Sequence, residues 1–231
     1  MKKYLISPFF APIFFSACWL LLVGGIFVFA HKNLSLLLEE HGILENITNI
    51  AYISLWITYI CLAKFFFSLN KNTKIDFVLY VILGISAFLR ELGIQHWLAS
   101  KDTTAFKSRF FLNPNNPISE KIIAGLILIA LLIIILYLAK KYTKHLVCSF
   151  FKMNPTTWSI ATLCTWGVVG KFIDRFPSNY KKAYGEVLNE NIFYALKILE
   201  ETSEIFLPII AAFILYQYRL INKKQSKLGK D

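Results

Sequence analysis

Several titratable residues lie inside segments that are otherwise apolar. Burying an ionised side chain there costs several kcal/mol unless it is paired or hydrated. Carboxylates at helical spacing beside an imidazole could bind a divalent cation that activates water, or they could act as general acid and general base. The residues that fit this pattern form the candidate catalytic set, which is Arg90, Glu91, His96, Glu200, Glu201 and Glu204.

The acids near the C-terminus share one side of a predicted helix. At about 100° per residue, Glu204, Lys197 and Glu201 all fall within about 100° of Glu200. Pro208 lies on the same stripe and has no N–H to donate to the carbonyl of Glu204, so we expect a kink there. Carboxylates that share a single ammonium repel one another unless a proton, a metal or another cation intervenes. The stripe is therefore typical of a functional site.

The histidines limit which metal such a site could hold. Only His96 is placed to join the acids of the last apolar segment, because His31 and His41 belong to the first outer loop and His145 to the opposite side of the membrane. A zinc site of three histidines does not fit this distribution. A carboxylate-rich site for a harder divalent cation fits it better, with the identity of the metal left open.

A second set of charged residues could bind a substrate. Lys107 and Arg109 lie in a predicted outer loop, and Asp174 and Arg175 end the fifth apolar segment. Lys and Arg above a carboxylate cluster are the groups that a phosphate-bearing lipid head group requires. We therefore predict these four as substrate-binding residues, with membrane lipids as partners and an envelope lipid as the substrate of a membrane enzyme or binding protein.

Two other classes of protein and one purely structural interpretation remain open. In an ion-coupled transporter the acids beside Pro208 would bind the coupling ion, although the sequence has no internal repeat. A membrane assembly or scaffold protein without catalysis is the other class. Structurally, Arg90 could pair with Glu200 or Glu204 only to fix helix packing, while the aromatic residues form a belt at the membrane interface.

The composition indicates which elements carry these residues. Hydrophobic residues make up 56% of the 231, mean hydropathy is +0.54, and the 17% of charged residues is below the roughly 25% usual in soluble domains. Apolar runs near the ~20 residues of a spanning helix occupy 9–30, 47–68, 76–99, 119–139, 156–172 and 191–219. The sequence predicts an all-α polytopic membrane bundle of six transmembrane helices, forming one domain over 1–231.

The charges predict the orientation of this bundle. With six crossings both termini share a side, and that side takes more than half of the 25 basic residues but only Asp76 and Asp231 of the 14 acids. The positive-inside rule then places both termini in the cytoplasm of a bacterial cell, with the protein in the inner membrane. We read the basic tail 219–230 as part of this signal and expect no nucleic-acid partner. Oligomeric state is left open.

The predicted outer loops are 32–45, 100–118 and 173–190. Pro177, Ser178 and Asn179 are typical of a turn within the last of these loops. The first could be a short amphipathic surface helix or an ordinary loop. The four cysteines show no disulfide pattern, and the first apolar run is too long for a cleaved signal, so we expect it to be the first helix.

Overall fold

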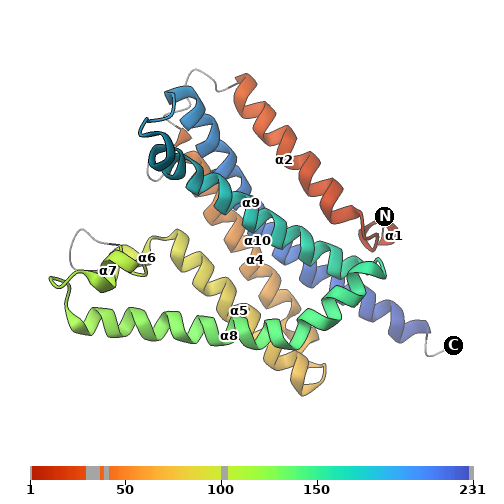
Figure 1. Cartoon of the computed structure of the whole chain (residues 1–231). Coiled ribbons are helices and arrows are strands. Elements are labelled where there is room, and N and C mark those ends of the chain that lie inside the picture. Colours follow the sequence, from red (N-terminus) through yellow and green to blue (C-terminus); the bar gives the residue numbers. More distant parts are fainter. Residues whose placement is uncertain (1, 30–36, 39–41, 100–103, 229–231) are drawn as a thin grey trace. The chain divides into compact units, whose positions relative to one another are not determined.

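The computed structural model describes residues 2–29, 37–38, 42–99 and 104–228, and every regular element in these ranges is a helix (Figure 1). The predicted all-α class is confirmed. The helices are α1 (Lys2–Leu5), α2 (Phe10–Phe29), α4 (Ile43–Phe67), α5 (Lys71–Glu91), α6 (Ile94–Trp97), α7 (Ser108–Leu112), α8 (Ile118–Phe151), α9 (Pro155–Tyr184) and α10 (Glu190–Leu228).

Within the described residues, four helices are long and apolar enough to cross a membrane, namely α2, α4, α5 and α8. This supports the membrane-protein class that the sequence predicts. The two long helices α9 and α10 are not among the four, and α10 carries the acids Glu200, Glu201 and Glu204 in its first half. The count of six spans and their orientation therefore stay predictions.

Two predicted boundaries are wrong. The turn expected at Pro177 is absent, because α9 continues through this proline to Tyr184 and is capped by Gly185, whose φ of +74° suits glycine. The third apolar run is not one helix, because α5 ends at Glu91 and Gly93, at φ +72°, separates it from α6. Most of the predicted first outer loop, 32–45, lies outside the described residues.

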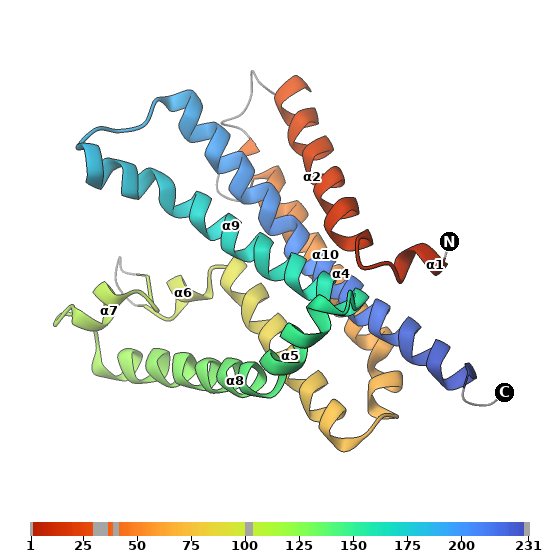
Figure 2. The same ribbon diagram turned by 45° about the vertical axis from the view of Figure 1, so that its right-hand side comes forward.

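The chain forms two compact units, the first made of residues 1–65 and 149–231 and the second of residues 66–148. The prediction of one domain over 1–231 stays a prediction. In the first unit α2 and the start of α4 pack with α9 and α10, which lie side by side (Figure 2). Its core consists of buried apolar side chains, which are Ala11, Phe15, Leu44, Ala51, Ile205, Phe206 and Ile210.

Polar side chains are also buried inside the first unit. Gln217 is fully buried, accepts a hydrogen bond of 2.9 Å from Ser159, and donates one of 2.8 Å to the carbonyl of Leu5. The indole N–H of Trp19 donates to the hydroxyl of Thr202 at 3.0 Å. Because buried polar groups need partners, these bonds fix how α1, α2, α9 and α10 are aligned along one another.

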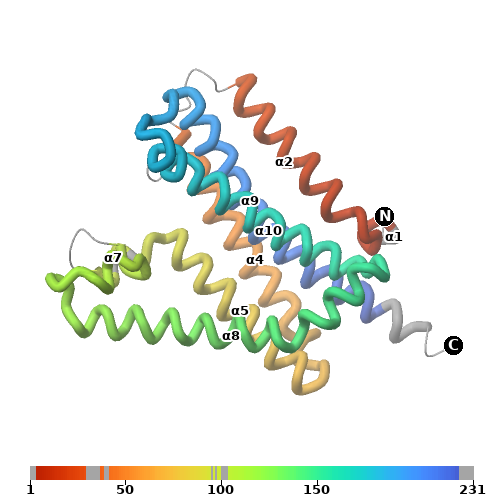
Figure 3. The backbone as a smooth tube through the Cα atoms, in the orientation of Figure 1, coloured from red at the N-terminus to blue at the C-terminus, as the bar shows by residue number. Residues whose placement is uncertain are grey.

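In the second unit the backbone runs along α5, passes through α6 and α7, and returns along α8 (Figure 3). Ala105, Phe110 and Ala124 form a small core at the α7 end. The side chain of Asp76 is almost fully buried and accepts bonds of 2.6 and 2.7 Å from Lys141, as well as a bond from the hydroxyl of Tyr142. This ion pair ties the first turns of α5 to α8.

The helices α9 and α10 make a close contact at Gly170. A Cβ added there would lie 2.7 Å from the hydroxyl oxygen of Ser203, which donates a hydrogen bond of 2.7 Å to the carbonyl of Glu200. Only hydrogen fits between these helices without moving Ser203. Gly167, one turn away on the same helix, has no atom within 4 Å of the same added position.

We predict that Gly170→Ala is less stable than Gly167→Ala by about 1 kcal/mol, because Ser203 must rotate and lose its bond to Glu200. Gly167→Ala is the matched control and should be neutral or stabilising by up to about 1 kcal/mol, since alanine favours the helix. Thermal unfolding of the purified protein in detergent measures both.

The double variant Gly170→Ala with Ser203→Ala removes the oxygen that obstructs the new methyl group, so it should recover most of the stability lost in Gly170→Ala. Equal melting temperatures for Gly170→Ala and Gly167→Ala would contradict this account of the α9 and α10 contact.

Candidate functional site

A pocket of about 230 Å³ opens between α9 and α10 in the first unit. Its residues recur at i, i+1, i+4 and i+5 on α9 and at i, i+3, i+4 and i+7 on α10, which is one face of each helix. The lining residues are Ile173, Asp174, Pro177, Ser178, Phe193, Leu196, Lys197 and Glu200. We call this the α9–α10 groove; it combines an apolar wall with charges of both signs.

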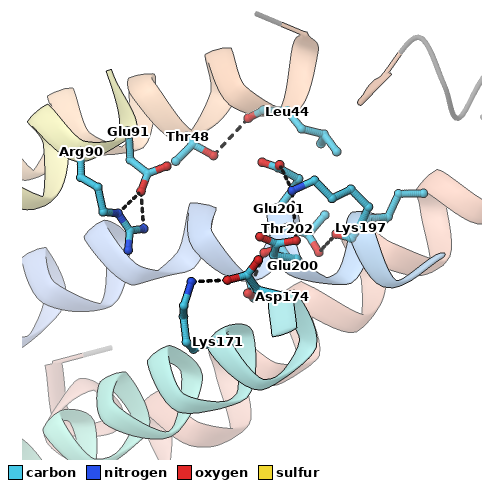
Figure 4. Close-up of polar contacts among 12 residues, drawn as sticks. Leu44, Thr48, Arg90, Glu91, Lys171, Asp174, Lys197, Glu200, Glu201 and Thr202 are labelled. Atoms are coloured by element: carbon cyan, nitrogen blue, oxygen red, sulfur yellow. Dashed lines mark hydrogen bonds and ion pairs between the residues drawn. The ribbon is translucent and has the colours of Figure 1, made fainter. Parts of the chain in front are cut away.

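Lys197 is paired with two carboxylates of its own helix. Its ammonium lies 3.0 Å from Glu200 and 3.1 Å from Glu201, whose side chains are only 12% and 23% exposed (Figure 4). The stripe inferred from helical periodicity thus brings these three residues together. Glu204 is half-buried one turn further along α10 and does not line the groove, and Pro208 is buried within the same continuous helix.

The groove face of α9 supplies a second ion pair. The ammonium of Lys171 contacts the carboxylate of Asp174, and the carboxyl groups of Asp174 and Glu200 contact each other across the groove (Figure 4). Partial burial disfavours the ionised form of Asp174, but the contacts with Lys171 outweigh it and hold the pKa of the carboxyl below its usual value. The two helices therefore share one network of alternating charges.

The network has a net negative charge. Three carboxylates, those of Asp174, Glu200 and Glu201, face two ammonium groups, those of Lys171 and Lys197. Because a low-dielectric site favours charge balance, the groove can accept one further positive group or hold one shared proton. This is the chemistry that the arrangement supports.

The other predicted catalytic residues belong to the second unit. Arg90 forms an ion pair of 2.5 Å with Glu91, its neighbour in sequence, and the arginine is 54% exposed while the glutamate is 14% exposed (Figure 4). His96 is exposed on α6, past the break at Gly93. The sequence predicts that Arg90, Glu91 and His96 contact the acids of α10. This contact would join the two units, and it stays a prediction.

The predicted substrate-binding residues divide in the same way. Lys107 precedes α7, Arg109 lies in it, and both are exposed in the second unit. Asp174 lines the groove, whereas Arg175 is exposed on α9 and does not. The structure thus brings Asp174 together with Glu200 and Glu201, and leaves Arg175 outside this network.

The sequence interpretation missed several residues of the groove. Lys171 and Lys197 were not predicted as site residues, although their spacing to Asp174 and Glu200 is that of helical ion pairs. Phe193 and Leu196 form part of the apolar wall. They could have been found because they lie on the same helical face as Lys197.

For the described part of the chain, no group of three or more His, Cys, Asp or Glu side chains is arranged to hold a metal ion. The groove brings two carboxylates together, and the third is turned toward Lys197. The divalent cation that the sequence allowed therefore finds no complete set of protein ligands among these residues.

Comparisons with known proteins identify no relative of this chain. The sequence matches no model of a protein family, no curated protein and no solved structure. The helices define the class as a membrane-type helical protein, and any more specific function depends on the groove.

We predict that Lys197→Met destabilises the protein by about 1–3 kcal/mol at neutral pH. The substitution leaves Glu200 and Glu201 without their ammonium; breaking a buried pair costs about 3–5 kcal/mol, and the partial exposure of Lys197 reduces this value. The melting temperature in detergent at pH 7 measures the effect.

Lys182→Met is the matched control, since this lysine is exposed on α9. Adding Glu201→Gln to Lys197→Met removes one of the unpaired charges and should restore part of the lost stability. If the Lys197 and Lys182 variants melt at the same temperature, the ion pairs of Lys197 with Glu200 and Glu201 do not stabilise the protein.

Proposed function

We propose that the chain is a multi-pass protein of the bacterial inner membrane, with six spans and both termini cytoplasmic, that binds and processes the head group of an envelope lipid at the α9–α10 groove. The observation that carries this proposal is the groove itself, which combines an apolar wall with both signs of charge. A lipid head group presents the same combination, because its charged groups adjoin the start of the acyl chains.

The residues would have separate roles in ligand binding, according to their charge. The acids Asp174 and Glu200 would bind a positive group of the ligand, since the network lacks one positive charge. Lys107 and Arg109 would bind phosphate, for which exposed Lys and Arg are suited. In an enzyme, the shared proton between the two groove carboxyls would make one the general acid and the other the general base.

An ion-coupled transporter is the second candidate. It is favoured by one observation, that Glu200 and Glu201 share the single ammonium of Lys197 and could exchange that partner for a transported cation. Transport would appear as a proton or cation flux in proteoliposomes without any change in lipids, whereas lipid processing changes the mass of a lipid. A scaffold would give neither result.

The test compares envelope lipids by mass spectrometry in cells that lack the protein and in cells that carry restored forms of it. We expect one lipid to shift in mass or amount on deletion, and to return with the intact chain but not with Glu200→Gln. Glu186→Gln is the matched control, because Glu186 is an exposed acid in the connection between α9 and α10.

Glu204→Ala and Arg109→Ala extend the test to the acid outside the groove and to the proposed phosphate-binding loop. Immunoblots of membranes verify that each variant accumulates. Lipid processing at the groove is ruled out if deletion leaves the lipid profile unchanged, or if Glu200→Gln and Glu186→Gln restore it equally. Flux assays in proteoliposomes would then test transport.

A further inference from the structure

The C-terminal part of α9, residues 171–184, carries an exposed row of aromatic rings. They are spaced four residues apart, and successive ring centroids are 6.4, 6.4 and 4.8 Å apart. This aromatic ladder consists of Phe172, Phe176, Tyr180 and Tyr184. Phe172 and Tyr184 are 68% and 69% exposed. An exposed apolar strip of this kind marks an interaction surface.

The rest of the same segment is basic. At about 100° per residue, the ladder with its neighbouring apolar residues covers an arc of about 140°, and all polar and charged residues of 171–184 occupy the remainder. Asp174 is the one acid in the segment, and it is paired in the groove. The basic residues of this face are exposed and comprise Lys171, Arg175, Lys181 and Lys182.

The order of residues along the helix indicates a lipid partner rather than a protein. Val168 is 70% exposed and precedes Phe172, so the strip begins with purely apolar side chains. It then passes to Tyr180 and Tyr184, which carry hydroxyl groups, beside Lys181 and Lys182. Polarity increases in the same order from the acyl chains through the interface to the phosphates, where tyrosine and lysine are favoured.

The length of the segment determines how it can meet that interface. From Phe172 to Tyr184 the helix advances about 18 Å. The interfacial layer on each side of a bilayer is only about 5–8 Å thick. A straight segment along the membrane normal places Phe176 and Tyr180, which lie about 6 Å apart along the axis, in the layer together, with Phe172 toward the acyl chains and Tyr184 toward water. α9 is one unbroken helix from Pro155 to Tyr184, and its Asp174 and Pro177 line the groove with α10, so the segment continues the course of the helix.

We propose that residues 171–184 of α9 pass through the interfacial layer of the membrane and bind anionic phospholipid head groups. The aromatic ladder contacts the interface, and the basic face contacts the phosphates, as interfacial aromatic and basic residues do. The inference rests on the proposed crossing of the membrane by α9, and it goes beyond the groove because the ladder and the basic residues bind the bilayer itself.

Hydroxyl-radical footprinting of the full chain in lipid nanodiscs tests this proposal. The modification rates of Phe176 and Tyr180 are measured in phosphatidylglycerol and in phosphatidylcholine, relative to the unfolded chain. We expect both rings to react several-fold more slowly in phosphatidylglycerol. Lys182→Gln should reduce that difference by up to about fivefold, the effect of one basic residue at an anionic surface, whereas Lys152→Gln, an exposed lysine at the opposite end of α9, should not.

Equal rates in the two lipids would overturn the proposal, as would rates close to those of the unfolded chain in both. Rings that react freely in both nanodiscs but are protected in native membranes would indicate a protein partner and would also overturn it. Cysteine labels at Met153 and Glu186, read from each side of the membrane, test separately whether α9 crosses it. Labels on opposite sides of the membrane together with unprotected rings would reject lipid binding by residues 171–184 and leave the proposed topology intact.

Discussion

The close packing of α9 against α10 is the constraint on which the site depends. Gly170 admits Ser203 at a distance that no side chain on the glycine would allow. The contact lies one helical turn from Asp174 on one helix and less than one turn from Glu200 on the other. Any separation of the helices at this contact would therefore also separate the two carboxyl groups that meet across the groove.

Local ion pairs explain how several charged side chains can lie partly buried beside apolar ones. Each carboxylate of the groove has an ammonium three or four residues away on its own helix, so the ion pairs form locally and do not depend on distant loops. The contact between Asp174 and Glu200 then joins two local pairs into one network. A network of this kind is sensitive to one added charge, which is the property that a binding site for a charged head group or an ion requires.

The contacts that could be predicted from the sequence are those between neighbours along one helix. The stripe of Lys197, Glu200 and Glu201 follows from periodicity alone. The meeting of Asp174 with Glu200 could not be predicted, because it depends on how two helices are aligned along each other. The extension of α9 beyond 172 was missed because hydropathy detects only the apolar part of a helix, and Pro177 suggested a turn. Similarly, Gly93 looks unremarkable in sequence yet ends the helix that carries Arg90.

The distribution of polarity gives a reason for the membrane class that is independent of hydropathy. Gln217 and Thr202 are fully buried inside the first unit, whereas Leu21 and Phe29 of α2 are 76% and 89% exposed. A protein folded in water would reverse this arrangement, since burial of apolar surface would drive its folding. In a bilayer, polar and small residues hold helices together while apolar ones face lipid. Helices whose polar side chains pack against other helices can therefore span a membrane, so the polarity of α9 and α10 is compatible with the proposed six spans.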